Sequence, residues 1–306
     1  MKLEGIHHIT AITADAQDNI DFYAGVLGLR LVKKTVNQDD PSVYHLFFAD
    51  ERGSAGADLT FFEFPGAPRG RAGEGMVHTV AWRVASGEAL DFWAERLNAG
   101  DVAIERDGGT LRFADPEGLG HELRVSEADD EALIADHPAI PPELALRGFD
   151  GVRAFSSTPE RSERLLSELG FERQGGDAAW EARGGSRGGT IGYEQPSTER
   201  PLQGAGTVHH VAWASTPEEL ESWRGRVAAG GAHPTPVIDR FYFRSVYFRE
   251  PSGVLFEIAT LGPGFTVDEP LESLGEKLSL PPDYEHLRER VEARLKPVHS
   301  PRKVAA

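Results

Sequence analysis

The sequence contains no cysteine, which excludes disulfides, thiolate metal ligands and thiol nucleophiles. Any metal site must therefore use histidine, aspartate or glutamate, which suit a harder metal ion than a cysteine-rich site does. Basic residues are also few, because 32 lysines and arginines stand against 49 acidic residues, a formal charge of -17. That charge repels phosphate backbones and anionic lipid surfaces, so we expect neither nucleic acid nor a membrane as a partner.

Long apolar runs are missing too. No stretch approaches the roughly 20 residues that span a bilayer, and no signal-peptide pattern precedes the first predicted strand. We therefore expect a cytoplasmic protein. The chain has 306 residues and a hydrophobic content of 40%, which is enough for well-buried cores in two domains or one large one.

Two segments far apart in the chain repeat each other. "VHTVAW" at 77–82 and "VHHVAW" at 208–213 differ at one position, and "DPEGLGHELRV" at 115–125 aligns without a gap on "EPSGVLFEIAT" at 250–260. This second alignment places Glu122 on Glu257. Such self-similarity indicates a duplicated structural unit. We predict four units of strand, helix and further strands, at about 3–64, 76–125, 147–194 and 207–260.

The helix of each unit is predicted from apolar residues three and four apart. The first helix should end at Gly28 and the second near Gly100. The fourth should begin at Thr216 as N-cap, with Pro217 in the first turn and Glu219 completing a capping box. The predicted apolar faces are Ile20, Tyr23 and Leu27; Leu90, Trp93 and Leu97; Leu165, Leu166 and Leu169; and Leu220, Trp223 and Val227.

The segment 126–146 is acidic, contains three prolines and is predicted to link two halves, 1–125 and 147–260, of two units each. Residues 261–306 follow as a C-terminal extension with a predicted helix around 284–295. The glycine-rich stretch 183–189 lacks the strand-to-helix context of a phosphate loop and predicts a hairpin turn. One unit is too short to bury its own sheet face, so two must combine into one curved sheet around a cavity.

Pairs of adjacent histidines occur twice, as His7 and His8 in "GIHHITAIT" and as His209 and His210 in "TVHHVAWAS". Successive side chains on a strand face opposite ways. His8 and His210 should therefore face one site, and His7 and His209 should face away from it unless a bulge turns them.

Comparison of the four units shows which of them carry a histidine at the position of His210. The position of His210 is occupied by His8 in the first unit, by Thr79 in the second and by Gly151 in the third. His8, His210 and Glu257 thus make two imidazoles and one carboxylate. This set holds Fe(II) on one face and leaves positions open for a substrate and O2.

A fourth ligand is a separate question. Glu63 lies near the position of Glu257 in the first unit, but "LTFFEF" is also typical of a strand with one solvent-facing carboxylate. A carboxylate alone is not diagnostic, because Glu122 occupies this position in a unit without the histidine.

At these residues the chain resembles the vicinal oxygen chelate superfamily, over nearly its whole length. "HHITAITADAQDNIDFYAGVLGLRLVKKTVNQDD", "YHLFFAD", "ALRGFDG" and "GVLFEIAT" resemble more narrowly the bacterial hydroquinone-cleaving dioxygenases. The resemblance implies an α+β fold in which four βαβββ modules pair into two open-barrel-like domains. It also implies that His8, His210 and Glu257 bind Fe(II), with Mn(II) as the alternative.

The same resemblance implies a function. A small aromatic diol and O2 would be the partners, and the ring would be cleaved beside a hydroxylated carbon with both oxygen atoms incorporated. The family's tyrosine and arginine fall on Tyr247 and Arg240, types that can donate to a bound oxygen species and stabilise an oxyanion. We expect Tyr247 and either His7 or His209 to assist proton movement.

Alternative functions stay open at this point. A glyoxalase-like isomerase would need four protein ligands, so Glu63 in the ligand set would favour it. A metal-free resistance protein that binds an aromatic compound would not need His8, His210 and Glu257 together. The sequence separates neither hydroquinone from catechol nor a monomer from a homo-oligomer.

Overall fold

The computed structural model describes residues 1–175 and 178–301; the end of the predicted C-terminal extension, 302–306, lies outside the described residues. The strands appear in four groups that match the four predicted units. Their bounds are β1 Ile6–Thr13, β2 Arg30–Asn37, β3 Asp40–Ala49 and β4 Asp58–Glu63; β5 Val77–Val84, β6 Ile104–Asp107, β7 Thr110–Ala114 and β8 Gly120–Val125; β9 Phe149–Phe155, β10 Glu172–Gln174, β11 Ala179–Arg183 and β12 Gly188–Glu194; β13 Val208–Ser215, β14 Ile238–Asp239, β15 Arg244–Arg249 and β16 Leu255–Thr260.

One helical segment follows the first strand of each unit. These segments are α1 Ala16–Ile20 with the π-helix η1 Asp21–Val26, α2 Gly87–Ala99, the 3-10 turn η2 Pro159–Ser162 with α3 Glu163–Glu168, and α4 Leu220–Ala229. The extension carries η3 Phe265–Val267, η4 Leu271–Ser273, η5 Pro282–Leu287 and α5 Arg288–Arg294. None of the helices described for this chain is long and apolar enough to cross a membrane.

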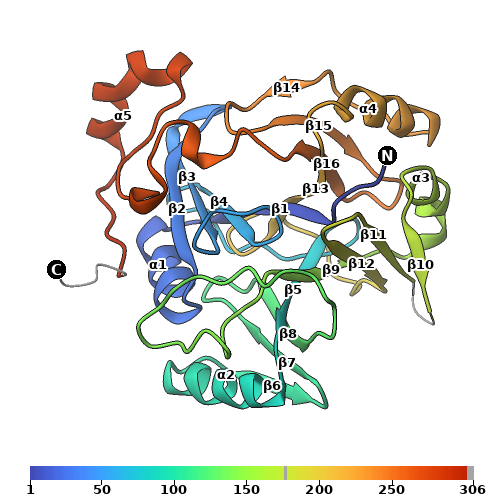
Figure 1. Ribbon diagram of the computed structural model, residues 1–306, viewed down its shortest axis with the longest axis horizontal. Helices are drawn as coiled ribbons and strands as arrows, with labels where there is room; N and C mark the ends of the chain where they lie inside the picture. Colours follow the sequence, from blue (N-terminus) through green and yellow to red (C-terminus); the bar gives the residue numbers. More distant parts are fainter. Residues whose placement is uncertain (176–177, 302–306) are drawn as a thin grey trace.

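The strands form two mixed eight-stranded sheets (Figure 1). The first sheet has the order β14-β15-β16-β13-β1-β4-β3-β2 and joins units one and four. The second has the order β10-β11-β12-β9-β5-β8-β7-β6 and joins units three and two. The units meet through the antiparallel pairs β1 with β13 and β5 with β9.

This architecture confirms the predicted fold class of four modules paired into two open sheets. Each sheet takes one unit from each half of the chain, a pairing order that the sequence left open. The division of the chain into domains at 1–125 and 147–260 stays a prediction.

The helices cover one face of each sheet with the apolar residues that the spacing predicted. All twelve of these side chains are buried, and they belong to one continuous core with strand residues such as Trp82 and Trp213. α2 ends at Ala99 before Gly100, and the backbone turns at Gly28 with φ +71. A positive φ of this size suits glycine because it has no Cβ. Both predicted helix ends are therefore confirmed.

The start of the fourth helix was predicted wrongly. α4 begins at Leu220, and no side-chain cap hydrogen bond is made at its start. Residues 217–219 instead form one turn, in which the Glu219 amide donates to the Thr216 carbonyl at 3.2 Å. This bond spans three residues rather than the four of an α-helix, so the predicted capping box does not form.

Two smaller predictions are confirmed. β11 and β12 pair as an antiparallel hairpin, and Gly184 donates to the Arg187 carbonyl at 3.0 Å within the glycine-rich turn. The predicted C-terminal helix appears as η5 followed by α5.

The C-terminal extension closes one end of the concave face of the first sheet, beside β2 and β3 (Figure 1). Lys33 on β2 is fully buried and donates to Asp268 at 2.7 Å and also to Glu269. Tyr242 donates to Asp268 at 2.9 Å. The residues packed in this end are Val32, Phe47, Ala49, Ala57, Ala212, Tyr242, Phe243, Ala259, Phe265 and Leu274.

Candidate metal centre

Each histidine pair lies at a β-bulge between β1 and β13. Ile6 is opposite Trp213 and His8 is opposite Ala212, so His7 is an extra residue on β1. In the same way Thr10 is opposite His210 and Ala11 is opposite Val208, which makes His209 an extra residue on β13. A bulge locally breaks the alternation of side chains. The condition attached to the prediction for His7 and His209 is therefore met, because each of them lies at a bulge.

The bulges place each extra histidine against its neighbour. His7 Nδ1 lies 2.9 Å from His8 Nδ1, and His209 Nδ1 lies 2.8 Å from His210 Nδ1. His7 also shares a hydrogen bond of 3.1 Å between Nε2 and the Thr260 carbonyl. When Nδ1 of an imidazole is engaged in a hydrogen bond, Nε2 of the same ring is the nitrogen that can bind a metal. In both His8 and His210 the free nitrogen is Nε2.

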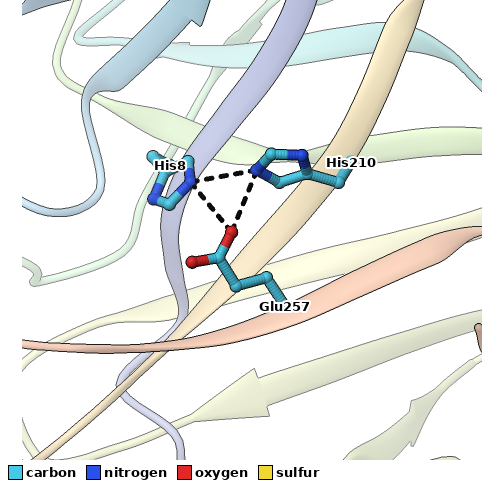
Figure 2. A group of neighbouring side chains, drawn as sticks. All are labelled: His8, His210 and Glu257. Carbon is cyan, nitrogen blue, oxygen red and sulfur yellow. Dashed lines mark hydrogen bonds and ion pairs between the residues drawn. The ribbon is translucent and has the colours of Figure 1, made fainter. Parts of the chain in front are cut away.

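The two Nε2 atoms and one oxygen of Glu257 form a small triangle (Figure 2). His8 Nε2 lies 3.2 Å from His210 Nε2, and Glu257 Oε2 lies 3.3 Å from His8 Nε2 and 3.0 Å from His210 Nε2. All three residues are buried. Among the residues that the structure describes, this is the group of histidine and acidic side chains close enough to hold one ion.

The geometry of this triangle fits a metal ion. Ligand atoms bound at about 2.1 Å, at right angles around one ion, lie about 3.0 Å from each other. Glu257 Oε1 accepts a hydrogen bond from Ser245, whereas Oε2 is buried with no hydrogen-bond partner in the described part of the chain. This oxygen faces the two imidazole nitrogens instead, and a cation held by all three atoms would compensate its buried charge.

The protonation states also suit a metal. Burial acts to raise the pKa of Glu257, but the neighbouring His8 and His210 outweigh it and hold the pKa well below its usual value. Burial lowers the pKa of His210. An ionised carboxylate and a neutral imidazole are the forms that bind divalent metals.

Tyr247 and Arg240 lie beside the triangle, as the resemblance implied. Tyr247 is directly opposite Glu257 in the pairing of β15 with β16, and its ring centre is 5.7 Å from that of His210. Arg240 Nε donates to the Tyr247 hydroxyl at 3.3 Å, and its two terminal nitrogens contact Asp39 at 3.1 Å each. Burial and Glu257 raise the pKa of Tyr247, so the phenol keeps its proton.

Glu63, the candidate fourth ligand, is not part of the ligand triangle. Its Oε1 accepts a hydrogen bond of 3.0 Å from the Ala16 amide at the start of α1, and its strand partner is Thr13. The strand register shows that the alignment near Glu63 was displaced. Glu257 pairs with Ala212, two residues after His210, and Thr60 pairs with Thr10, two residues after His8. Thr60 is therefore the counterpart of Glu257.

Two polar residues on the same concave face had no predicted role. Thr60 Oγ1 lies 2.9 Å from Thr10 Oγ1 and 2.9 Å from His45 Nε2. His45 belongs to the motif "YHLFFAD", where it shares a face with Phe47. A histidine between bulky apolar neighbours on a predicted strand was the available signal.

A cavity of about 270 Å³ reaches the second histidine pair from the side of β13 and β16. His209, which is exposed, lies in its wall together with His210. The remaining lining is partly apolar and partly polar: Gly75, Met76, Val77, Gln203, Val208, Arg249, Val254 and Leu255.

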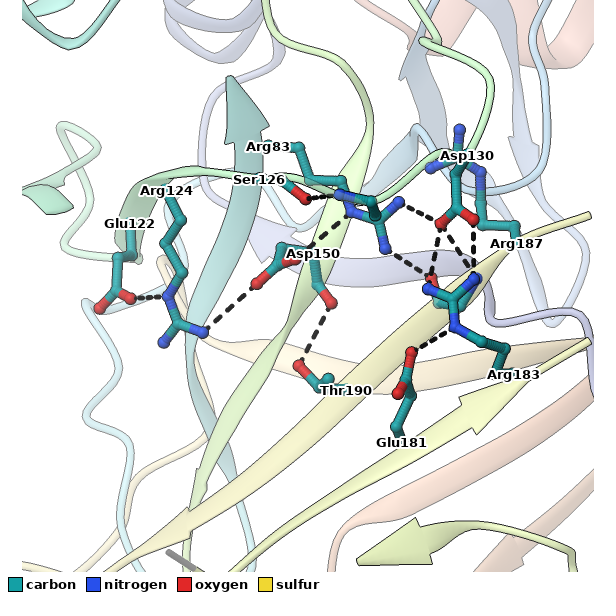
Figure 3. A network of polar contacts seen from close by, with 12 residues as sticks. Arg83, Glu122, Arg124, Ser126, Asp130, Asp150, Glu181, Arg183, Arg187 and Thr190 are labelled. Carbon is teal, nitrogen blue, oxygen red and sulfur yellow. Dashed lines mark hydrogen bonds and ion pairs between the residues drawn. The ribbon is translucent and has the colours of Figure 1, made fainter. Parts of the chain in front are cut away.

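The second sheet has a different cluster at the equivalent place. Glu122 is buried and accepts hydrogen bonds from Arg112, Arg124 and Arg153. Arg124 continues through Asp150 into a wider ion network at the linker (Figure 3). The bulge is retained, with His78 as the extra residue, and its Nδ1 lies 2.9 Å from Thr79 Oγ1.

Comparisons with known proteins agree with this picture. Residues 5–123 match the family model of the Glyoxalase/Bleomycin resistance protein/Dioxygenase superfamily. The chain is 44% identical over 304 residues to MhqO of Bacillus subtilis, a proposed ring-cleaving dioxygenase, and the match covers 97% of each chain. It is 33% identical over 311 residues to chlorohydroquinone/hydroquinone 1,2-dioxygenase of Sphingobium indicum, with 95% of each chain covered.

Solved structures give the same result. A proposed dioxygenase from Bacillus subtilis superposes with a TM-score of 0.90 at 43% identity, covering 98% of both chains. Glyoxalase I from Zea mays has a TM-score of 0.57 at 16% identity, over 84% of this chain and 92% of that one, and shares the fold. These matches confirm the family resemblance predicted from the sequence.

Proposed function

Because this chain belongs to the glyoxalase, bleomycin resistance protein and dioxygenase superfamily, among its ring-cleaving dioxygenases, we propose that it opens the ring of a hydroquinone with O2. His8, His210 and Glu257 would hold Fe(II), with Mn(II) as the alternative ion. The observation that carries this proposal is the buried triangle of two imidazole nitrogens and one carboxylate oxygen.

Three protein ligands leave part of the coordination sphere for substrate and O2, as in other iron sites with two histidines and one carboxylate. Fe(II), when bound, supplies the redox chemistry by which O2 reacts with the aromatic ring. The overall reaction balances as diol plus O2 giving one open-chain product. One carbon–carbon bond beside a hydroxylated carbon breaks, and both oxygen atoms are retained.

The chain's own residues position and stabilise the reactants. The Tyr247 hydroxyl keeps its proton and lies beside the ligand triangle, so it can donate to an oxygen atom of the bound reactants. Arg240 stays charged and is oriented by Asp39, so it can stabilise negative charge that develops on oxygen.

His7 and His209 act on the ligands rather than on the substrate. Each contacts the Nδ1 of its neighbour and so holds the Nε2 of His8 or His210 toward the metal position. Such partners raise ligand basicity and fix ring orientation. His209 is also exposed in the wall of the cavity, where a proton can pass to solvent.

The position of Glu63 argues against the isomerase alternative. That function was expected to need a fourth carboxylate, and Glu63 instead binds the Ala16 amide. The counterpart of Glu257 is the hydroxyl of Thr60, which is already engaged with Thr10 and His45.

The proposed function is tested by oxygen uptake. Protein loaded with Fe(II) without air is mixed with hydroquinone in aerated buffer, beside His210→Ala and beside Tyr247→Phe. We expect one O2 consumed per ring opened, no uptake by His210→Ala, and a loss of about 10²-fold or more in turnover for Tyr247→Phe. Metal binding without O2 uptake would refute ring cleavage, and unchanged turnover and O2 coupling in Tyr247→Phe would refute the role of that phenol.

A further inference from the structure

The open side of the ligand triangle is identified by the internal symmetry of the first sheet. β1 with β4 and β13 with β16 are equivalent parallel pairs. One pair contributes His210 and Glu257, and the other contributes His8 and Thr60. Thr60 therefore occupies the place where a fourth ligand would complete the site, and its neutral hydroxyl leaves this side of the triangle without a second carboxylate.

Thr60 is fully buried, and its hydroxyl connects two further residues. It contacts Thr10 Oγ1 and His45 Nε2, each at 2.9 Å. The His45 ring is packed between Phe47, at 4.0 Å between ring centres, and Phe62, at 4.4 Å. The ring is thus fixed in position by a hydrogen bond and two aromatic contacts.

The other nitrogen of His45 is free for a ligand. Nδ1 makes no hydrogen bond to any described residue, and the side chain is half-buried rather than enclosed. Burial, with His8, His210 and Arg240, lowers the pKa of His45 well below its usual value. The imidazole is then neutral, and when Nε2–H donates to Thr60, Nδ1 is an acceptor.

His45 also lies at the accessible end of the sheet. In the strand register His45 is opposite Phe62, Phe62 is opposite Ile12, and the neighbouring Ala11 is opposite Val208 in the cavity wall. The other end is closed by Phe243 and Phe265. The Phe62 ring centre is 5.6 Å from that of the exposed His209.

We propose that His45, oriented by Thr60, accepts a hydrogen bond at Nδ1 from the hydroxyl of the substrate farthest from the metal, and so selects para-diols over ortho-diols. This inference rests on the proposed function and deepens it. The two hydroxyls of hydroquinone point in opposite directions, so one can lie at the ligand triangle while the other extends toward His45. Both hydroxyls of catechol lie at the metal end and leave Nδ1 facing a C–H edge.

A comparison of ligands isolates this one hydrogen bond. Hydroquinone and 4-methoxyphenol both carry an oxygen at the far end, but only hydroquinone can donate from it. Binding of each, and of catechol, is titrated without air to Fe(II)-loaded wild-type protein, His45→Phe and Thr60→Val. His78→Phe, the same change at a histidine of the second sheet that contacts a threonine, is the matched control. Metal affinity and unfolding midpoint are measured for each variant.

We expect wild-type protein to bind hydroquinone about fivefold more tightly than 4-methoxyphenol, since a neutral hydrogen bond is worth about 1 kcal/mol. That ratio should fall to about one in His45→Phe, and part of the way in Thr60→Val, with metal affinity retained. His78→Phe should keep the full ratio. Thr60→Val keeps the test decisive if His45→Phe does not fold.

The two proposals fail in different ways. If the wild-type protein consumes O2 with hydroquinone but the ratio is equal in wild-type protein and both variants, the role of His45 is wrong and the proposed function stands. A preference for catechol over hydroquinone in wild-type protein would overturn the role of His45 as well. If no diol supports O2 uptake, the proposed function itself is wrong.

Discussion

The two sheets carry the same strand order and the same bulge, but they treat the same buried carboxylate differently. In the first sheet Glu257 faces two imidazoles, and in the second Glu122 faces three arginines. Both carboxylates are almost fully buried, at 0% and 1% exposed. The scaffold thus presents a buried negative charge twice, and the neighbouring residues decide what neutralises it.

The difference follows from the properties of the two side-chain types. A guanidinium is always charged and can reach a buried carboxylate from the half-exposed rim of the sheet, as Arg112, Arg124 and Arg153 do. Such a cluster is complete without a ligand. An imidazole can offer a lone pair to a metal, so His8, His210 and Glu257 form a ligand set that a cation completes.

Removing each carboxylate should therefore have opposite consequences. Glu257→Gln should weaken Fe(II) binding by more than about a hundredfold, because even groups outside the ligand set contribute 10- to 100-fold. Glu122→Gln should keep metal affinity but lower the free energy of unfolding by about 1–3 kcal/mol, since three half-exposed arginines lose their buried partner. Metal titration and denaturant unfolding of both variants make the comparison.

Equal losses of metal affinity in Glu257→Gln and Glu122→Gln would contradict the separation of the two sheets. A Glu122→Gln variant as stable as the wild-type protein would show that the arginine cluster contributes nothing net.

The histidines at the bulges provide a second comparison of metal affinity between the two sheets. His209→Phe removes the partner of His210 Nδ1 and should weaken metal binding about 10- to 100-fold through loss of ligand orientation. His78→Phe is the matched change in the second sheet, where the bulged residue contacts Thr79 instead. It should leave metal affinity unchanged. Metal competition assays distinguish the two, and equal affinities would mean that the bulge does not orient the ligand.

The last comparison concerns acid stability, which involves a histidine of the second sheet alone. Burial lowers the pKa of His121 in the second sheet from 6.5 to about 3, and the ring contacts Trp82 Nε1 and the Tyr23 hydroxyl. Between these values the unfolded chain binds a proton that the folded chain does not, so stability falls as pH decreases. The slope from this one group is about 1.4 kcal/mol per pH unit.

His121→Gln should reduce that slope between pH 6.5 and pH 4, measured by denaturant unfolding at each pH. The reduction should be the same in metal-free and Fe(II)-loaded protein, because His121 lies outside the ligand triangle. A reduction confined to the loaded protein would indicate that the two sheets are coupled.

Local patterns predicted the elements well. The apolar faces of all four helical segments and the ends at Gly28 and Gly100 follow from spacing and backbone chemistry alone. The start of α4 failed because a proline and a capping pattern also suit a single turn. The sequence allowed for a bulge but did not predict one. Two adjacent histidines do not by themselves indicate an extra residue in the strand pairing.

The candidate site also contains residues that the sequence predicted and residues that only the strand pairing revealed. Comparison of the repeats selected His8, His210 and Glu257, because a ligand set is a matter of residue type at equivalent positions. The displacement from Thr60 to Glu63 arose because the weakly matching first unit was aligned by residue type, whereas strand pairing places Thr60 opposite Thr10. His45 was missed because its contact with Thr60 crosses 15 residues and two strands.

By itself the sequence determined the four units, the candidate ligand types and the absence of any thiolate ligand, since these depend on local periodicity and on which side chains the chain carries. The tertiary structure alone decided that unit one pairs with unit four, because strand pairing between distant segments depends on how whole faces pack. That pairing brings His8 within 3.2 Å of His210, 202 residues away, whereas His45 and Thr60 contact each other between neighbouring strands of unit one.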